Sequence, residues 1–541
     1  MAAARKTPGV HIVESTIFPN SVVEVPTAVP AFIGYTEKAD HQGTSLSNVP
    51  WRITSLAQFV EHFGGPPLGR FTLVDAAPPV LHATPPALFE SDFSLRLPNC
   101  PSGEKKEYWL RQDSGVFLLY YSMQLFFQNG GAACYIVSVG HYDECLDADK
   151  LLNGIAALSK EAEPTLLVVP DAVLLEGTQG HRSSACIAVQ QAVIKHCGEE
   201  MKNRFAILDI HDGFRARSDP AGDCIAQFRD ALGTQTLDFA AAYYPWLDTT
   251  IVAEKDLSYL NIKNPEVLQT LLIADMMLDP ALAPADPISK KQFDDKTRAV
   301  GAITRTWAID KDTLKTDDDI TRAKLAINQL LHQFSPLYAI VMAAIAKKLN
   351  RLPPGAAMAG LYTSVDHARG VWKAPANVSL NAVIAPAVDI SHEAQEDMNG
   401  TTTGKSINAI RAFAGAGVLV WGARTLDGNS VDWRYINVRR TMIMLEESLR
   451  LAMAAYAFEA NVANTWVTVK GMANNFLTGI WKRGGLAGAS PGEAFSVFVG
   501  LGETMTVNDI LDGIMRVTVL VALSGPAEFI EITFQQQMQQ A

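Results

Sequence analysis

Two short apolar runs, PTLLVVP at residues 164–170 and RFAILD at residues 204–209, decide the fold class. Each has the length of a buried strand, and the segment between them, around residues 185–196, has helical spacing. Continuous apolar strands that alternate with helices are typical of a parallel sheet that is covered on both faces. The sequence therefore predicts an α/β layer in the middle of the chain.

The same alternation continues outward from these two runs. Residues 116–128 carry aromatic and aliphatic side chains at helical spacing, Asn129-Gly130-Gly131 ends that helix, and CYIVSV at residues 134–139 reads as a strand. Downstream, AAAYYPW at residues 240–246 predicts another strand that closes on a proline. We therefore expect a mixed α/β, multi-domain chain.

The last third of the chain contains the clearest predicted helix, residues 439–461. One face of that helix is an apolar stripe at steps of three and four residues, formed by Met442, Leu445, Leu449, Met453 and Tyr456. The other face carries Glu446, Glu447 and Arg450. We also expect the segment after Lys405, residues 407–411, to be helical.

Both ends of the chain read as extended arms. Near the start, Val10, Ile12 and Val13 lie in a β-prone run that follows Pro8-Gly9. Near the end, residues 526–528 open a period-2 strand to which Phe529, Ile530, Ile532 and Phe534 belong. A lone strand exposes unpaired backbone groups, so each arm needs the edge of a partner sheet.

Composition and charge argue against several classes of protein. The 541 residues include 45 Lys and Arg and 57 Asp and Glu, a formal net charge of −12, which disfavours a nucleic-acid binder with a basic face. The longest apolar stretches, residues 337–346 and 517–523, fall short of the roughly 20 residues that cross a bilayer, so no direct membrane insertion is expected. No secretory signal is visible, and we expect assembly in the cytoplasm.

The residue types that carry catalysis or bind metals form no recognisable pattern. The six cysteines include no C-x-x-C pair, and the eleven histidines form no metal-binding helix pair. No G-x-S-x-G elbow occurs, and we interpret His367, next to Asp366, as structural. We expect reduced, mostly buried thiols, no metal, no cofactor and no enzymatic activity.

Proline clusters and the predicted elements suggest five parts of the chain. They are an extended arm at residues 1–20, a core at 21–35 and 116–350 with insertions, a proline-rich inserted lobe at 36–115, a C-terminal domain at 351–525, and a strand arm with a polar tail at 526–541.

One alternative function comes from NGTTTGKS at residues 399–406. This segment differs from a phosphate-binding P-loop only in having Asn399 where the first glycine belongs. In that interpretation Lys405 would contact phosphate and Ser406 would contact magnesium. However, a P-loop follows a buried strand, whereas residues 391–398 are polar and acidic. Nucleotide binding therefore stays the alternative hypothesis.

Several separated motifs together resemble the contractile tail sheath family of myophages, pyocins and extracellular contractile injection systems. They are PGV at residues 8–10, FF at 126–127 with NGG at 129–131, YYPW at 243–246, PP at 353–354 with AG at 359–360, Asp366 with RGVWKAPAN at 369–377, WGARTL at 421–426, WRYINVRR at 433–440 and PAEF at 526–529. Their order covers both ends and nearly all of the chain after residue 350.

The resemblance implies a structural protein and a set of partners. Sheath subunits of this family form stacked hexameric rings around an inner tube, exchange strands through their terminal arms, and contract to drive the tube through a target envelope. The implied partners are further copies of the chain, the inner tube protein, baseplate and terminator or cap proteins, and in some systems a sheath paralogue. The implied location is a phage tail or a phage-tail-like particle.

Charged residues near the C-terminal motifs are candidates for contacts with other subunits or with the tube. They are Arg424, Arg434, Arg439, Arg440, Glu446 and Glu447. The alternative for Arg424 and Arg434 is a salt bridge inside the domain.

Overall fold

The computed structural model describes residues 22–75, 91–96, 105–177, 182–305, 316–400 and 404–529. The chain divides into two units. Unit 1 comprises residues 1–26, 370–372 and 440–541, and unit 2 comprises residues 27–369 and 373–439. The five-part division expected from the sequence stays a prediction.

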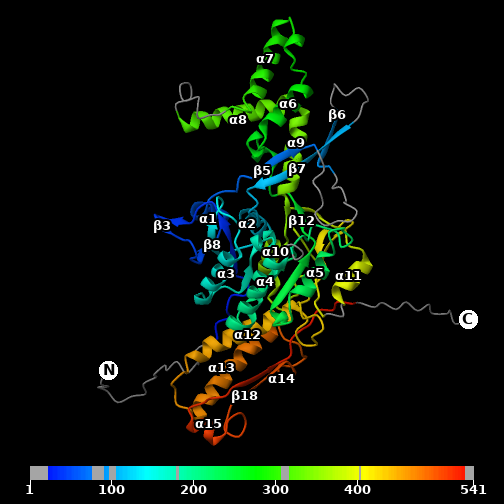
Figure 1. The fold of residues 1–541 in the computed structure, drawn as a ribbon. Coiled ribbons are helices and arrows are strands. Elements are labelled where there is room, and N and C mark those ends of the chain that lie inside the picture. The colour runs from blue at the N-terminus through cyan, green and yellow to red at the C-terminus, as the bar shows by residue number, and fades with distance from the viewer. Residues whose placement is uncertain are drawn as a thin grey trace, which may run out of the picture. The chain divides into compact units, whose positions relative to one another are not determined.

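An open nine-stranded sheet forms the centre of unit 2 (Figure 1). Its order is β14-β17-β16-β11-β10-β9-β1-β8-β4, and the six strands from β16 to β8 run parallel. The strand bounds are β1 Pro30–Thr36, β4 Trp51–Ile53, β8 Cys134–His141, β9 Leu166–Val168, β10 Phe205–Asp209, β11 Ala240–Tyr244, β14 Val378–Ser379, β16 Asn408–Phe413 and β17 Gly417–Val420. The apolar runs in the sequence therefore form the parallel strands, which confirms the predicted α/β class.

Helices pack on both faces of this sheet because consecutive side chains of β1 point in opposite directions. Phe32 stacks edge to face on Phe126 of α2 (Leu119–Gln128), with ring centroids 5.1 Å apart. On the other face, Ile33 packs close to Gly154 of α3 (Ala148–Ala157). Helix α10 (Gly355–Arg369) joins α2, and α4 (Ser184–Lys195) joins α3. Residues 30–36 are buried throughout, as a central strand requires.

A second group of elements in unit 2 combines a small sheet with helices. The sheet has the order β5-β7-β6, with bounds Arg70–Val74, Lys105–Ser114 and Phe93–Arg96. The helices are α6 Pro265–Asp275, α7 Pro287–Gly301, α8 Asp317–Phe334 and α9 Pro336–Leu349. Among the described residues no single helix is long and apolar enough to span a membrane, and the pair 318–334 and 336–349, which passes that test jointly, is bent by 111°.

The remaining elements of unit 2 are short. They are β2 Asp40–His41, β3 Thr44–Ser45, α1 Leu56–Phe63, α5 Cys224–Ala231, β12 Leu247–Thr249, β13 Arg351–Leu352, β15 Val383–Pro386 and α11 His392–Asn399. Strands β13, β12 and β15 form a separate three-stranded sheet.

Unit 1 is built on two helices and a strand pair. Helix α12 (Ile436–Ala454) starts in unit 2 and continues into unit 1, where α13 (Ala463–Lys482) follows it. The antiparallel pair is β18 (Phe495–Phe498) and β19 (Thr518–Val521), and the short helices are α14 (Pro491–Ala494) and α15 (Val507–Leu511). The core of the unit contains Leu445 and Leu449 of the predicted apolar stripe.

Two expectations about local structure need correction, and a third is not tested. Residues 407–411 were expected to be helical, but Asn408–Phe413 is strand β16, because it pairs with β11 and β17 inside the sheet. The helix expected over 439–461 ends at Ala454. The C-terminal strand arm stays a prediction: residues 526–529 have no strand partner within the described part of the chain, and residues 530–534 lie outside it.

Candidate assembly surfaces

Both arms emerge from unit 1. Val10, Ile12, Val13, Ile530, Ile532 and Phe534 lie outside the described residues, whereas Phe529 is described and is 79% exposed. The root of the N-terminal arm is fixed: Val22 and Val25 pack against the core of unit 1, and the N–H of Val25 donates to Ser448 Oγ at 3.1 Å. Arg483, which directly follows α13, forms an ion pair with Glu24.

The strand pair of unit 1 is the sheet that lies closest in sequence to the C-terminal arm. Phe495 pairs with Val521 and Phe498 pairs with Thr518. An isolated bridge between Leu486 and Leu523 prolongs the pairing toward the arm. Within the described residues neither strand has a second neighbour, so the outer edge of each strand is open. A two-stranded sheet with open edges is a template for added strands.

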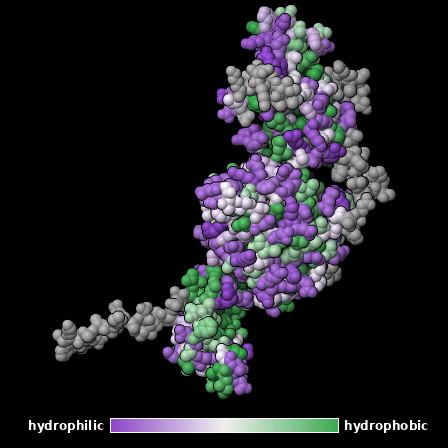
Figure 2. All heavy atoms as spheres, turned by 60° about the vertical axis from the view of Figure 1, so that its left-hand side comes forward, coloured by the Kyte–Doolittle hydropathy of each residue, from purple (hydrophilic) through white to green (hydrophobic). Residues whose placement is uncertain are grey.

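Unit 1 also exposes many large apolar side chains. Figure 2 shows hydrophobic residues gathered at the lower end of the view, where Figure 1 places α13, α15 and β18. Phe458, in the turn after α12, is fully exposed with a positive φ of 69°, and Leu511 is 78% exposed. The other exposed members are Leu451, Val462, Val467, Leu501, Val507, Ile514 and Leu520. A large apolar surface of this kind marks an interaction site.

Arg424 and Arg434 are held inside unit 2 by backbone carbonyls. Arg424 is 8% exposed, and its guanidinium donates to the carbonyl of Asn399 at 2.9 Å. The half-buried Arg434 donates from Nε to the carbonyl of Ser430 at 2.9 Å. These contacts fix the two loops on either side of residue 427. Their role at an interface stays a hypothesis.

Arg439, in the first turn of α12, is surrounded by its own unit. Its guanidinium lies 3.7 Å from the ring centroid of Phe239 and 4.6 Å from that of Trp433. Its Nε lies 3.4 Å from Asp238 Oδ2. Burial raises the pKa of Asp238, and the charge of Arg439 opposes that rise. Arg439 therefore stabilises the start of α12 by ion pairing and cation–π contact.

The remaining three candidates lie in unit 1. Arg440 is 4% exposed. Glu446 is exposed, and Glu447 forms a two-point ion pair with Arg450 at 2.6 and 2.7 Å. Among the six charged candidates, Glu446 therefore has the side chain most accessible to a partner.

The P-loop-like segment has the wrong neighbours for a phosphate site. Helix α11 precedes it and strand β16 follows it, whereas a P-loop needs a strand before and a helix after. Lys405 is 5% exposed and donates to the carbonyl of Arg229. Ser406 donates to the carbonyl of Asn399 at 2.7 Å. The two side chains that would bind phosphate and magnesium are thus engaged with the backbone.

The described residues also show no metal-binding group, and most of their thiols are buried. No group of three or more His, Cys, Asp or Glu side chains there is arranged to hold a metal ion. Cys134, Cys186, Cys197 and Cys224 are free and buried, and Cys145 is free and exposed. Burial raises the pKa of Cys197 to about 12, so this thiol is unreactive at neutral pH.

Sequence reasoning missed two of these features. The apolar surface of unit 1 collects residues from segments that look unremarkable one by one, so no single stretch of the sequence indicated it. The packing of residues 22–25 on α12 and α13 could not be read from the sequence, because it joins segments more than 400 positions apart.

The chain is similar to known proteins in both sequence and fold. Residues 429–536 match the family described as phage tail sheath C-terminal domain. The fold resembles a chain of the contracted anti-feeding prophage baseplate, with 24% identity, a TM-score of 0.58, and coverage of 98% of this chain and 99% of that one.

Two sheath structures give similar results. A chain of the contracted helical sheath of the anti-feeding prophage has 24% identity and a TM-score of 0.56, with 99% and 100% coverage. A chain of the contracted PVC sheath complex, an extracellular contractile injection system, has 24% identity and a TM-score of 0.53, with 99% coverage of both chains. No curated protein matches the chain. These findings confirm the resemblance to contractile tail sheath proteins that the motifs indicated.

Proposed function

We propose that this chain is a structural subunit of a contractile sheath and that it works by assembly and repacking, not by catalysis. The observation that carries the proposal is the combination of a sheath C-terminal domain match at residues 429–536 with a sheath-like fold over 98–99% of the chain. By analogy, its partners are further copies in hexameric rings, an inner tube, baseplate and cap proteins, and in some systems a sheath paralogue. It is assembled in the cytoplasm as part of a phage-tail-like particle.

The geometry of unit 1 supports strand exchange as the means of assembly. The roots of both arms, residues 22–26 and 522–529, belong to the unit that holds the open β18–β19 pair. An arm from a neighbouring copy would satisfy the backbone groups on one open edge, and apolar residues such as Ile12 and Ile532 would cover the apolar surface beside it. Main-chain hydrogen bonds of this kind can persist while the globular bodies rotate.

Contraction requires two packings of the same subunits that differ in free energy. The exposed apolar side chains of unit 1 supply surface that a tighter packing would bury, at roughly 25 cal/mol per Å². No nucleotide is needed in this scheme, because the free energy is stored in the extended assembly. The engaged Lys405 and Ser406 agree with that view.

The test is electron microscopy of the full chain coexpressed with its inner tube protein. Wild-type protein is expected to form hollow striated cylinders. Val10→Asp with Ile12→Asp is expected to abolish them, because two charges in the added strand oppose its burial. Ala2→Asp with Ala4→Asp adds the same charge to the same arm outside the apolar run, and should leave the cylinders intact. A monodisperse chain in every sample would contradict the proposal.

A further inference from the structure

The central sheet of unit 2 has a topological switch point between β1 and β9. The chain leaves β1 toward β8 on one side, whereas it leaves β9 toward β10 on the other side. Open α/β sheets bind ligands in the crevice at the carboxyl ends of the strands, where neighbouring connections separate. The position is defined by chain topology alone, independently of any assembly role.

A cavity of about 450 Å³ lies at this carboxyl edge. It is lined by Leu174 after β9, Phe214 after β10 and Trp246 after β11, and by Phe117 and Leu118 at the start of α2. This volume is within the range of small-molecule sites, roughly 300–1,000 Å³. The cavity therefore lies at the carboxyl edge of the sheet beside the switch point, where the segments after β9, β10 and β11 meet.

A buried carboxylate caps the amino end of α2 next to the cavity. Asp171 is fully buried, and its carboxylate accepts the N–H of Leu118 at 2.7 Å and the N–H of Tyr35 at 2.8 Å. The amino end of α2, where a phosphate would otherwise sit, is thus already occupied by a carboxylate. An anionic ligand in the cavity would therefore need a counter-charge from another side chain.

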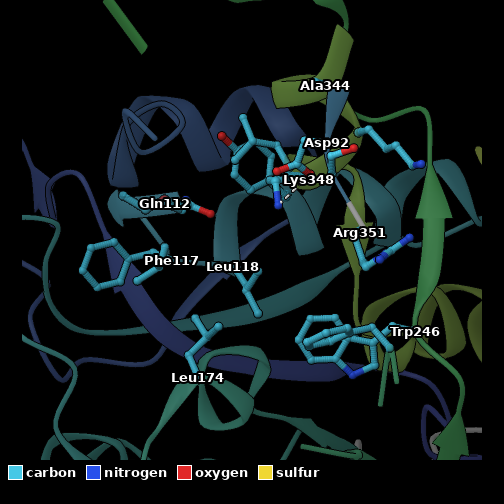
Figure 3. Close-up of a pocket in the computed structure, with 16 residues that line it drawn as sticks. Asp92, Gln112, Phe117, Leu118, Leu174, Trp246, Ala344, Lys348 and Arg351 are labelled. Atoms are coloured by element: carbon cyan, nitrogen blue, oxygen red, sulfur yellow. Dashed lines mark hydrogen bonds and ion pairs between the residues drawn. The ribbon is translucent and has the colours of Figure 1, made fainter. Parts of the chain in front are cut away.

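The opposite side of the cavity is cationic. Figure 3 shows Phe117, Leu118, Leu174 and Trp246 along one side, with Asp92, Ala344, Lys348 and Arg351 across from them.

Lys348 pairs with Asp92 at 2.9 Å, and Arg351 pairs with Asp248 at 2.8 Å. Lys347 also lines the cavity, is exposed, and has no acidic partner within the described part of the chain. Lys347 therefore places one positive charge beside the apolar wall without a neutralising carboxylate among the described residues.

The wall is rigid as well as apolar. The indole N–H of Trp246 donates to the carbonyl of Ile210 at 2.8 Å, and its ring packs edge to face on Phe214 with centroids 5.2 Å apart. A planar ligand body would meet a preformed surface, which lowers the entropy cost of binding.

We propose that this cavity is a binding site for a small organic anion with a planar, apolar body. The aromatic wall receives the body of the ligand, and Lys347 receives its negative charge. The site does not depend on the sheath function, and it adds a ligand-binding property to the core of the subunit.

The test uses two probes of nearly equal ring structure. 8-Anilinonaphthalene-1-sulfonate carries a sulfonate, and N-phenyl-1-naphthylamine lacks it. Titration of the purified full chain, followed by fluorescence and calorimetry, is expected to give one sulfonate probe per chain, bound about tenfold more tightly than the neutral probe.

Two variants and a control locate the binding. Ala344→Phe fills the cavity and should abolish binding of both probes. Lys347→Glu, at an exposed position that should not affect folding, should remove the preference for the anionic probe. Lys291→Glu makes the same charge change on α7 and should leave binding unchanged. Several probes per chain, equal affinity for the two probes, or wild-type binding by a folded Ala344→Phe protein would overturn the proposal.

Discussion

The carboxylate of Asp209, at the end of β10, accepts a hydrogen bond at 2.6 Å from the backbone N–H of Gly355, the first residue of α10. Asp209 is 4% exposed, and burial raises the pKa of its carboxyl group to about 7, although the Gly355 N–H opposes that rise. One side chain thus joins the central sheet to the helix that follows Pro353-Pro354.

Asp209→Asn is expected to flatten the pH dependence of stability. The pKa of Asp209 is higher in the folded chain than the usual value of about 3.9, so folding favours the protonated carboxyl group. The stability that Asp209 contributes is therefore fully present below pH ~4 and is lost as pH rises through about 7.

Asparagine keeps an oxygen acceptor for Gly355 and removes the titration. Relative to wild type, the variant should gain stability between pH 5 and pH 8, on the order of 2–4 kcal/mol. Urea unfolding of both proteins at several pH values measures this difference. A difference independent of pH would contradict the assignment, and the similarly raised pKa of Asp171, about 6, affects both proteins equally.

Gly355→Ala is expected to destabilise the same contact. A Cβ at this position would lie 2.6 Å from Asp209 Oδ2, closer than atoms can approach, so the helix or the carboxylate must shift. We expect a loss of about 2 kcal/mol or more in the free energy of unfolding. Gly301→Ala at the end of α7 is the control, because a Cβ there meets nothing within 4 Å. Equal Tm values for the two variants would be inconsistent with this contact.

Arg439 and Glu446 should separate folding from assembly. Arg439→Met is expected to lower the free energy of unfolding by about 2–4 kcal/mol, because it leaves the partly buried Asp238 without its cation and removes the contacts to Phe239 and Trp433.

Because Glu446 is exposed, Glu446→Lys should cost less stability than Arg439→Met and should alter cylinder formation. Calorimetry and electron microscopy of both variants give the two readouts. Unchanged assembly of Glu446→Lys would remove this residue from the interface.

Lys405→Ala is expected to act on stability and not on nucleotide binding. The side chain donates to the carbonyl of Arg229, and loss of that buried bond should cost about 1–3 kcal/mol. Millimolar Mg-ATP should leave the Tm of wild type unchanged, because a ligand raises Tm only when it binds the folded state. The exposed Lys291→Ala serves as the control. A rise in Tm with nucleotide that Lys405→Ala abolishes would restore the P-loop hypothesis.

Local patterns in the sequence were sufficient to predict the parallel strands of the central sheet. Residues 134–139, 164–170 and 204–209 are mostly apolar because a strand buried on both faces has no solvent-facing side, so their order alone indicated an α/β layer. The helix expected at residues 407–411 was wrong, since a segment as short as INAIR fits a helix or a strand equally well. Pairing with β11 and β17, which are distant in sequence, decides in favour of the strand.

The sequence by itself determined the class of the fold and the family resemblance, because these depend on residue order and spacing within short windows. The two apolar arms stay a prediction from the sequence. Only the tertiary structure decided which charges are accessible and where the arms begin. Arg424, Arg439 and Arg440 look like surface residues in the sequence, but Arg424 and Arg440 are buried, and contacts within unit 2 leave Arg439 half-buried. The cavity beside Trp246 likewise exists only because parallel strands place the segments after β9, β10 and β11 at one edge of the sheet.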